Sequence, residues 1–591
     1  MADIKCGLEI HQQLATHKLF CECESRIVED LSNVKDFYRV LSLSKSEIGE
    51  IDKAAMHEAL KNKKFRYLAP PSSSCLVEMD EEPPHDVNQE ALIITLQAAR
   101  LLNARIIDEA QVMRKIVIDG SNTSGFQRTM LIATDGFIDT SNGKVRIETI
   151  CLEEDAARKI EEKEGVVTYC LDRLGIPLIE IATAPDIKTP KQARETAEKI
   201  GLLLRSLKVK RGLGTIRQDI NISIKGGARV EIKGAQDLRL IERIVELEAR
   251  RQERIIEFSK KAERPDIGPL VDLTNIFTNT SSRLVSNGLK KGYRVMGFIV
   301  KNFKGLLGYE LYSNKRIATE ISDYIKTRIS IGGLLHGDEL PGYGISTDEI
   351  KAVKKELGVR ENDNYVLFIE TEEKCVKARE LFIERLSQLV KGVPSEVRRA
   401  NPDGSTTFMR PMPGSARMYP ETDIRPIVLR GIEVETPRTI FELVDEYKSL
   451  GLPEDLAMIA AKERIPLREL AEKYKLDIKT VARILVYTPR MVKTKTGKEC
   501  VIEEEKMHEL LRLYSQGLIN RQGVEALLEE YATKHLWNPD KYKPLSRKEI
   551  EKILEEILKK TKNRKEIMRI ISSYGNIDPR IVIEILKERG L

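Results

Sequence analysis

One face of the first predicted strand carries both a carboxylate and an imidazole. Residues 5–11 alternate strictly, with Cys6, Leu8 and Ile10 on one face and Gly7, Glu9 and His11 on the other. Glu9 and His11 therefore point the same way and can reach one divalent ion, while Gly7 leaves room for a substrate to approach. The alternative interpretation of this spacing is a polar strand face that is exposed to solvent and binds no ion.

Two further acidic positions follow or interrupt apolar runs. The triplet Glu153-Glu154-Asp155 directly follows the run Ile150 to Leu152, and carboxylates at a strand end are well placed for Mg²⁺. A cluster of negative charge at a helix N-terminus is the alternative. Glu180 interrupts the apolar run 178–182, which is typical of a buried strand. Burying this carboxylate costs several kcal/mol unless it is paired, so the sequence predicts a cationic partner for Glu180.

Two later strands show the same alternation and suggest the floor of a polar cleft. In residues 218–225 the isoleucines line one face, while Asp219, Asn221 and Ser223 line the other. In residues 230–233, Glu231 and Lys233 point outward. A ligand cleft typically has a floor of neighbouring strands that present acid, amide, hydroxyl and lysine side chains. An antiparallel sheet with one solvent-exposed face would give the same pattern and is the alternative.

Standard fingerprints for nucleotides and metals are missing. The sequence has no G-x-x-x-x-G-K-[ST] loop, no G-x-G-x-x-G and no kinase motif set, so any ATP site lacks a standard signature. Cys21 and Cys23, together with Cys6 and Cys75, are candidates for a four-thiolate structural zinc site. Their spacing is not C-x-x-C twice over, so isolated core thiols remain the favoured interpretation.

The elements that must position these residues divide the chain into several parts. A length of 591 residues is too great for one hydrophobic core. We expect a multidomain α+β fold in which residues 1–264 and 392–436 form a mixed α/β catalytic domain and residues 265–391 form an inserted α+β domain. Residues 437–515 and 516–591 are predicted to form two C-terminal helical domains. The Arg- and Pro-rich stretch 393–427 is expected to be an irregular loop, because proline is excluded from helix interiors and central strands.

Composition narrows the class of protein. Hydrophobic content of 41% and charged content of 32% are typical of a folded globular protein rather than a disordered or membrane one. We expect a cytoplasmic protein with reduced thiols, because there is neither a long apolar span nor a signal-type N-terminus. From Lys541 to Leu591 the chain has fourteen Lys and Arg against eight Asp and Glu, and this excess equals the net charge of +6 of the whole chain. Such a basic tail favours nucleic-acid binding, with a solvated Lys-rich helix as the alternative.

Five sequence blocks, in order, resemble the GatB/GatE family. They are GLEIHQQL (Gly7 to Leu14), CLEEDAARKI (Cys151 to Ile160), LDRLGIPLIEIAT (Leu171 to Thr183), IRQDINISI (Ile216 to Ile224) and VEIKGAQDL (Val230 to Leu238). The likeness extends over nearly the whole chain and implies a cradle domain, a helical domain and a YqeY-like tail. The inserted domain resembles the extra domain of bacterial-type aspartyl-tRNA synthetases, which is found in the archaeal E branch of the family.

The resemblance implies a defined reaction. The family uses ATP and Mg²⁺ to phosphorylate the γ-carboxylate of glutamate mischarged on tRNA(Gln), and ammonia then displaces phosphate to give Gln-tRNA(Gln). Ammonia comes from a separate asparaginase-like partner of the GatD type, which implies a heterotetramer of two D and two E subunits with no membrane component. This chain has no Ser/Thr/Lys amidase pattern, which agrees with the release of ammonia by a separate subunit.

The resemblance also places the candidate residues in one reaction. Phosphoryl transfer to a carboxylate brings two anions together, so a metal and protonated side chains must offset their charge. Candidate Mg²⁺ ligands are Glu9, His11, Glu153, Glu154 and Glu180; Asp219, Asn221, Ser223 and Glu231 are expected to line the cleft, and Lys233 and Arg173 to contact phosphate or carboxylate. Two other classes remain open: an aspartyl-tRNA synthetase, which would release AMP and pyrophosphate, and a non-catalytic tRNA-binding scaffold.

Overall fold

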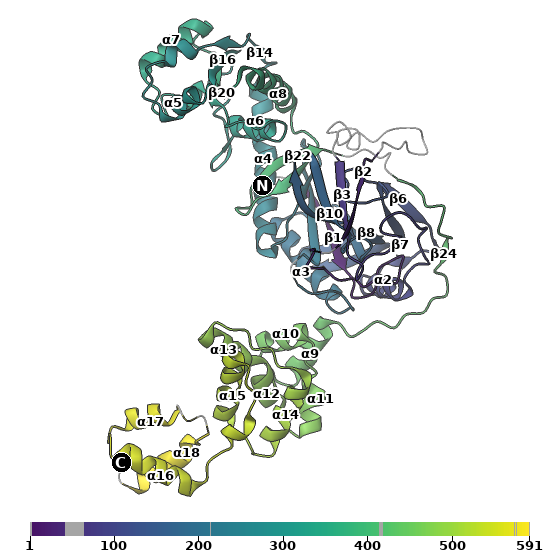
Figure 1. Ribbon diagram of the computed structural model, residues 1–591, viewed down its shortest axis with the longest axis vertical. Helices are drawn as coiled ribbons and strands as arrows, with labels where there is room; N and C mark the ends of the chain where they lie inside the picture. Colours follow the sequence, from purple (N-terminus) through teal and green to yellow (C-terminus); the bar gives the residue numbers. More distant parts are fainter. Residues whose placement is uncertain are drawn as a thin grey trace. The chain divides into compact units, whose positions relative to one another are not determined.

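The chain folds into two compact units, Met1–Pro437 and Arg438–Leu591 (Figure 1). The computed structural model describes residues 3–32, 34–41, 64–212, 214–412, 418–572, 574 and 576–589. The predicted multidomain α+β class is confirmed, since several sheets and many helices are present. The finer four-part division stays a prediction. None of the described helices has both the length and the apolar character needed to cross a membrane.

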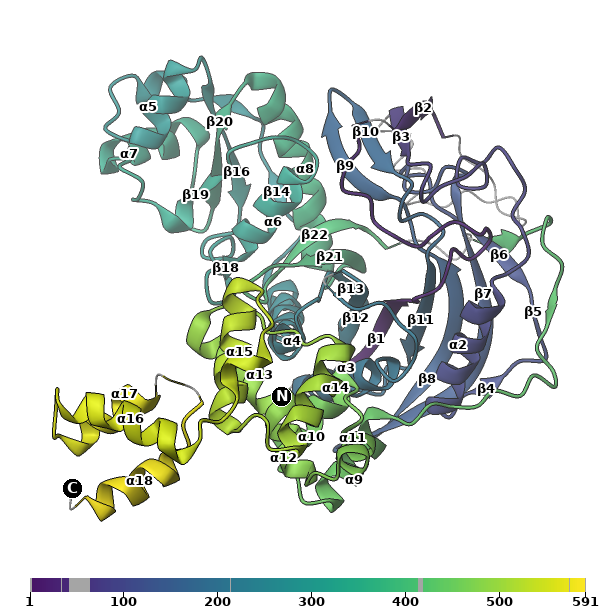
Figure 2. The same ribbon diagram turned by 60° about the horizontal axis from the view of Figure 1, so that its bottom comes forward.

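The first unit is built on one large, mainly antiparallel sheet with β1 near its middle (Figure 2). Its strands, in spatial order, are β22 (Thr406–Pro411), β21 (Glu396–Ala400), β13 (Val230–Lys233), β12 (Ile216–Ile224), β1 (Ile4–Gln13), β11 (Pro177–Thr183), β8 (Gly143–Glu154), β7 (Phe126–Thr140), β6 (Val112–Ile116) and β23 (Met418–Pro420), with β4 (Arg105–Ile106) pairing β7.

Three helices cover the apolar face of this sheet. They are α2 (Gln89–Leu101), α3 (Pro190–Leu204) and α4 (Leu238–Lys261), and their side chains share one core with the strands. Leu8 and Ile10 of β1 and Ile220 of β12 are at most 1% exposed. Burying each such side chain stabilises the fold by about 1.5–3 kcal/mol. The apolar set therefore fixes which way every strand faces and leaves the opposite face to the polar side chains.

The stretch 393–427 is not the irregular loop that its prolines suggested. It supplies β21, which runs parallel to β13, and β22, which closes the edge of the sheet. Pro411 is the last residue of β22, and an edge strand tolerates proline because one row of its backbone N–H groups is not needed for pairing. Residues 413–417 of this stretch lie outside the described residues.

Two smaller sheets also belong to the first unit. Strands β2 (Lys35–Arg39), β3 (Lys64–Ala69), β10 (Val166–Cys170) and β9 (Arg158–Lys163) form a four-stranded sheet with a small core of its own. Strands β5 (Glu109–Ala110) and β24 (Ile427–Val428) pair with each other.

Residues 265–391 form a sheet covered by helices. The sheet order is β14 (Asp266–Ile267), β16 (Arg294–Lys301), β20 (Asn364–Glu370) and β19 (Leu335–His336), and β15 (Val271–Asp272) also pairs β16. The other elements are the hairpin β17 (Glu310–Tyr312) and β18 (Lys315–Arg316), with helices α5 (Arg283–Lys290), α6 (Ile317–Lys326), α7 (Thr347–Leu357) and α8 (Glu372–Lys391). Ser346 caps α7 in a capping box with Glu349, as its sequence suggests.

A buried cluster of three arginines and three glutamates joins helices α6 and α8 to α4 and to the large sheet. Its members, which we call the buried ion cluster, are Glu248 and Arg251 of α4, Glu320 of α6, Arg385 of α8, and Glu396 and Arg398 of β21, all at most 1% exposed. Glu320 accepts hydrogen bonds from Arg385 and Arg398, each at 2.7 Å. Arg385 also donates to Glu396 at 2.6 Å. Each charge is therefore paired and hydrogen-bonded inside the protein, as burial requires.

The described part of the second unit contains helices and no strand. Its helices are α9 (Ile440–Ser449), α10 (Glu454–Glu463), α11 (Leu467–Tyr474), α12 (Ile478–Ala482), α13 (Thr488–Thr496), α14 (Glu504–Ser515), α15 (Arg521–Lys534), α16 (Arg547–Leu558), α17 (Arg564–Ser572) and α18 (Pro579–Glu588). The last three pack around a separate core that includes Leu554, Ile567 and Ile585.

Replacing Glu320 with Gln should destabilise the first unit by about 3–5 kcal/mol, because it leaves buried arginines without a full counter-charge. Burial raises the pKa of Glu320, but Arg398, Arg251, Lys315 and Arg385 lower it well below its ordinary value of 4.5. The stabilisation is therefore fully present above pH 4.5 and is lost only as the pH falls through the lower, folded-state pKa.

Differential scanning calorimetry of the full chain measures this effect. The matched control is Glu257→Gln, which removes an exposed partner of Arg254 and Tyr309 and should change stability by less than about 1 kcal/mol. Equal melting temperatures for the Glu320→Gln variant and the wild type at pH 7 would show that the cluster does not stabilise the unit.

Candidate active site

A transverse row of polar side chains crosses the open face of the large sheet. The strand registers place His11 of β1 opposite Glu180 of β11, and Glu9 opposite Asp219 of β12. On the next strand, β8, Cys151 lies opposite Glu180. Side chains in such cross-strand positions are close enough to interact directly, so the row forms one continuous site.

His11 lies at the centre of three carboxylates. Its Nε2 is 3.2 Å from Glu180, and 3.5 Å from both Glu9 and Glu153. Burial by itself lowers the pKa of His11, but the hydrogen bond to Glu180 and the charges of Glu153, Glu180 and Glu9 raise it to about 9. Without a metal, the ring is therefore an imidazolium at neutral pH.

Lys115 of β6 is the cationic partner that the sequence predicts for Glu180. Its Nζ lies 3.3 Å from Glu180 and 3.4 Å from Glu153. Burial raises the pKa of Glu180, but Lys115 and His11 together lower it below its ordinary value. The Glu180 carboxylate therefore stays charged although its side chain is only 14% exposed.

The negative charges of Glu9 and Glu153 are less well compensated by nearby cations than the charge of Glu180. Burial and the charge of Glu180 raise the pKa of Glu9, with His11 and Lys233 opposing them. Burial likewise raises the pKa of Glu153. A bound cation would therefore stabilise the charged form of both acids.

A second charged group stands beside Glu9, across β12 and β13. Lys233 Nζ lies 2.6 Å from both Asp219 and Glu231. Burial lowers the pKa of Lys233, but these two carboxylates raise it above its ordinary value, so the ammonium stays charged. Two acids hold this cation in a fixed place at the edge of the row.

Asp155 anchors the end of the cleft next to His11. It lies just beyond the end of β8, is 1% exposed, and accepts hydrogen bonds from Gln13 and Arg217, both at 2.7 Å. Arg173 approaches Asp155 to 3.8 Å. Asp155 therefore ties β1 and β12 to the segment that follows β8.

These groups line a cleft of about 840 Å³. Six carboxylates and four basic side chains line it, which leaves two negative charges when His11 is neutral. The charged lining residues are Glu9, Glu153, Asp155, Glu180, Asp219, Glu231, Lys115, Arg217, Lys233 and Arg410. A cleft of this size and charge suits a phosphorylated ligand together with a divalent cation.

The donor set on the His11 side fits Mg²⁺. One ligand atom each from Glu9, His11 and Glu180 lies within 4.8 Å of the others, and Glu153 touches the same imidazole. Mg²⁺ is bound by carboxylate oxygens with water completing its octahedron, and neutral imidazole serves other divalent ions as well. The three acids would hold the ion, and His11 would release its proton to join them.

Four of the predicted site residues are not part of the cleft lining, namely Glu154, Arg173, Asn221 and Ser223. Glu154 follows Glu153 directly, so strand alternation turns it to the opposite face, where it pairs with Arg128 at 3.5 Å. Arg173 donates to the carbonyls of Ala156 and Ala157 at 2.8 and 2.9 Å. Its guanidinium thus holds the loop backbone in place, and the residue is not part of the cleft lining.

Asn221 and Ser223 lie on the predicted face but further along β12. They pair with Gly7 and Lys5 of β1, beyond the cleft lining. Gly7 itself leaves no space for a substrate, because a Cβ there would lie 2.9 Å from the carbonyl oxygen of Thr183. The glycine is needed for close approach of the chain's own backbone.

The four-thiolate set proposed for zinc does not form. Cys6 points into the core of β1, fully buried, and donates weakly to the carbonyl of Gly7. Cys21, Cys23 and Cys75 do come together, but the fourth member of their group is Glu78.

Three basic residues of the cleft lining were not among the predicted site residues: Lys115, Arg217 and Arg410. Lys115 lies in a short strand whose polar positions alternate, and that pattern could have identified it. Arg217 precedes Asp219 by two positions, so the alternation that selected Asp219 also places Arg217 on the cleft face. No local pattern marks Arg410, which reaches the cleft only through the pairing of β21 and β22 at the sheet edge.

Comparisons with known proteins agree on one family. Residues 4–435 match the GatB/GatE catalytic domain. The chain is 46% identical over 586 residues to the E subunit of the glutamyl-tRNA(Gln) amidotransferase of Methanocaldococcus jannaschii, covering 95% of this chain and 92% of the relative. It is 44% identical to the proteins of the same name from Sulfurisphaera tokodaii, over 618 residues, and Saccharolobus solfataricus, over 621 residues, in each case covering 99% of this chain and 98% of the relative.

The pKa of His11 should fall by about 1 to 3 units when Glu180 is replaced by Gln, because a close negative charge is removed. Histidine-selective NMR of the chelator-treated protein can follow this, since the chain has seven histidines. The signal is assigned by its loss in His11→Ala. The control is Glu82→Gln, which removes an exposed carboxylate beside His85 and should leave His11 unchanged. A wild-type His11 that titrates below 6.5 would contradict the geometry.

Proposed function

The chain belongs to the GatB/GatE family, and from this premise we propose that its cleft performs the ATP-dependent amidation of glutamate carried by tRNA(Gln). Its relatives are named as subunits of a glutamyl-tRNA(Gln) amidotransferase, an enzyme of protein biosynthesis. The observation that carries the proposal is the convergence of Glu9, His11 and Glu180, flanked by Lys115 and Lys233, in one cleft.

The proposed reaction has two steps. The γ-carboxylate of the tRNA-bound glutamate attacks the γ-phosphorus of ATP, giving γ-glutamyl phosphate and ADP. Ammonia then attacks the activated carbonyl carbon, phosphate leaves with the bond electrons, and ammonia gives up one proton. The products are Gln-tRNA(Gln), ADP and phosphate.

The first step brings two anions together, and the lining of the cleft can offset that repulsion. When bound, Mg²⁺ would neutralise phosphate charge and help to align the two reactants. Glu9, Glu153 and Glu180 would hold the ion, with His11 deprotonated beside them. Because the charge of Glu9 is incompletely compensated by the protein itself, metal affinity should depend strongly on this residue.

Positive side chains would bind the anionic parts of the substrates. Lys233 is held by Asp219 and Glu231 at the cleft edge, and its charge is secured by both. We assign Lys233, Lys115 and Arg217 as phosphate or carboxylate contacts, because each lines the cleft. Arg173 acts on the backbone of the loop at Ala156 and Ala157 and so serves to position Asp155.

Ammonia would be supplied by a separate subunit of the asparaginase-like GatD type, in a heterotetramer of two D and two E subunits. This part of the proposal rests on the family resemblance and on the absence of amidase sequence patterns from this chain. An aspartyl-tRNA synthetase and a non-catalytic tRNA scaffold remain the competing functions, and the nucleotide product separates them.

The chain, supplied with Glu-tRNA(Gln), ATP, Mg²⁺ and an ammonium salt, should form ADP and Gln-tRNA(Gln). Glu9→Gln should reduce this ADP formation by more than about 100-fold, because even changes outside the ligand shell cost 10- to 100-fold at metal sites. Raising the Mg²⁺ concentration should partly restore the rate. The control Glu148→Gln removes an exposed carboxylate from the same sheet, outside the cleft, and should retain full activity.

Release of AMP and pyrophosphate would indicate a synthetase, and no nucleotide turnover would indicate a scaffold. If Glu9→Gln kept normal activity at low Mg²⁺, Glu9 would not be a metal ligand. Melting temperature and tRNA affinity are measured on the same preparation, since loss of both would make Glu9 a structural residue.

We also propose that helices α16 to α18 bind the tRNA backbone, because positive charge is concentrated there. Replacing the exposed Lys552, Lys559 and Lys560 with Gln should weaken tRNA binding and flatten its salt dependence, by about one unit of slope for each phosphate that is no longer bound. The matched control replaces the same lysines with Arg and keeps the charge. A filter-binding titration across salt concentrations gives both quantities, and equal slopes for the Gln and Arg variants would disprove the proposal.

A further inference from the structure

Two hollows adjoin each other within residues 265–391, between helix α6 and the segment around β19, both of which are labelled in Figure 2. One has a volume of about 420 Å³ and mostly polar walls, and the other has a volume of about 290 Å³ and mostly apolar walls. They share four wall residues, which are Ser322, Lys326, Leu334 and Tyr343. The two hollows therefore form one site with a polar part and an apolar part, and the proposed amidation makes no use of it.

The polar hollow carries charges of both signs that cancel. Its ionisable wall residues, apart from Tyr343, are Glu310, Arg316, Asp323, Lys326, His336 and Glu339. Asp323 is already paired with the buried Lys315, which lies outside the walls. Burial lowers the pKa of His336 below its ordinary value, so this ring is neutral at pH 7. Two cations and two carboxylates remain, and this balance favours a ligand that itself carries one charge of each sign.

Lys326 is available for the anionic group of such a ligand. Within the described part of the chain, neither its ammonium nor the guanidinium of Arg316 forms an ion pair or a hydrogen bond. A Cβ at Gly333 would lie 3.9 Å from Lys326 Nζ and 3.7 Å from Ser322 Oγ, so these two donors stand together where the hollows meet. Arg316 precedes α6, about 15 Å away along the helix axis, so a small ligand bound at Lys326 would not reach it.

Glu339 is a fixed carboxylate beside the shared wall. It accepts hydrogen bonds from the Tyr343 hydroxyl at 3.0 Å and from the backbone N–H of His336 at 3.3 Å. Tyr343 adopts the left-handed conformation, with φ of 59°, and its carbonyl accepts from the Ser282 hydroxyl at 2.6 Å. A bulky residue keeps such a conformation only where its surroundings demand it. Two donors use only part of the accepting capacity of a carboxylate, so Glu339 can also accept from an ammonium group.

The apolar hollow has room for a hydrocarbon side chain. Its walls include Leu335 and Leu367, which are 7% and 1% exposed, together with Ile369. Leu284 and Tyr343 also line it and are 48% and 54% exposed. A side chain placed here would cover apolar surface that otherwise faces water, and this burial would stabilise the complex.

We propose that this site binds a free α-amino acid with an apolar side chain. Lys326 and Ser322 would donate to its carboxylate, and Glu339 would accept from its ammonium group. The side chain would enter the hollow lined by Leu335 and Leu367. A zwitterion leaves the charge balance of the site unchanged, and binding breaks no covalent bond. The site shares no residue with the lining of the amidation cleft, so the amino acid would bind without occupying that cleft.

Isothermal titration calorimetry of the full-length chain tests the proposal without an activity measurement. L-leucine and L-phenylalanine, the two probes, should each bind saturably at millimolar concentrations. Isoamylamine lacks the carboxylate of leucine, 4-methylpentanoate lacks its ammonium, and glycine lacks its side chain. Each of these analogues should bind at least about tenfold more weakly than leucine, because a charge-assisted hydrogen bond or the apolar contact is lost. If neither amino acid binds saturably, or if leucine binds no better than the analogues, the site is not an amino-acid site.

Two substitutions assign the charges of leucine to their partners. Lys326→Gln should remove the advantage of leucine over isoamylamine, and Glu339→Gln should remove its advantage over 4-methylpentanoate. The exposed position of Lys326 makes its variant safe for folding, so the test stands even if Glu339→Gln does not fold. The matched control Lys355→Gln changes an exposed lysine of α7 outside both hollows and should bind leucine normally. An undiminished preference for leucine over isoamylamine in Lys326→Gln would refute the proposed contact.

A variant of the amidation cleft separates this proposal from the proposed function. Glu9→Gln should bind leucine with wild-type affinity, because Glu9 does not line either hollow. Loss of leucine binding in Glu9→Gln would place the amino acid in the cleft and overturn the second site. Failure of the amidation proposal would leave the leucine titrations of the wild type and of Lys326→Gln unaffected.

Discussion

The register of four neighbouring antiparallel strands, β8, β11, β1 and β12, is the constraint on which the cleft depends. Every second side chain of each strand lies on the face that carries the transverse row, and the intervening side chains enter the core beneath α2, α3 and α4. A slip of one residue in β1 would exchange Glu9 and His11 for Leu8 and Ile10. The burial energy of the apolar side chains is therefore what holds mutually repelling carboxylates a few ångströms apart.

Much of the site could be predicted from the sequence because its main signal is local. The two-residue repeat around Glu9 and His11 needs no knowledge of the partner strands, and it correctly placed both side chains on one face. The same reasoning predicted a cation for Glu180 from the cost of burying a lone charge, and Lys115 is that cation. The α+β class followed from similarly local patterns of alternation and helical spacing.

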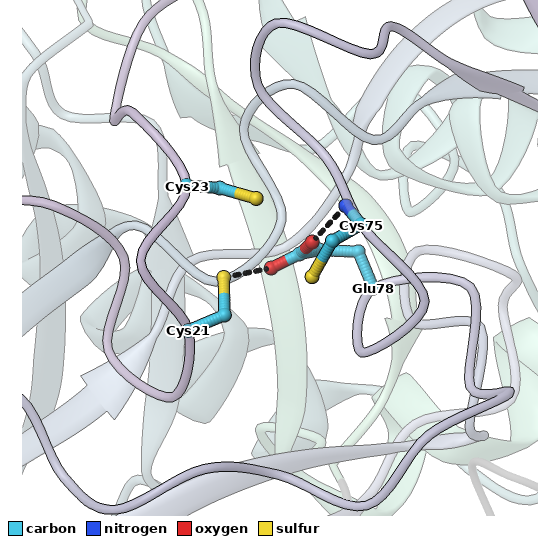
Figure 3. A group of neighbouring side chains, drawn as sticks. All are labelled: Cys21, Cys23, Cys75 and Glu78. Atoms are coloured by element: carbon cyan, nitrogen blue, oxygen red, sulfur yellow. Dashed lines mark hydrogen bonds between the residues drawn. The ribbon is translucent and has the colours of Figure 1, made fainter.

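The predictions that failed depend on contacts between distant segments or, for Glu154, on treating an acidic triplet as one group instead of applying the strand alternation to it. Glu154 was grouped with Glu153 as an acidic cluster, but neighbouring residues in a strand face opposite ways. Arg173 was expected to contact phosphate or carboxylate, yet it donates to the nearby carbonyls of Ala156 and Ala157. The proline-rich stretch 393–427 forms strands because β21 pairs with β13 in parallel and β22 closes the sheet edge. The sequence of the stretch itself does not show that these pairing partners exist. The position of Glu78 beside Cys21, Cys23 and Cys75 (Figure 3) was not predicted, because a search by thiol spacing does not include a carboxylate.

The composition of the buried ion cluster bears on how residues 265–391 relate to the rest of the first unit. This segment contributes Glu320 and Arg385, one acid and one base, while the remainder contributes the other two pairs. Each side of the junction is thus electrically neutral by itself. A chain without residues 265–391 would lose hydrogen bonds and packing at this junction. Its interior would contain no unbalanced charge, however. The segment could therefore be inserted or deleted in one step.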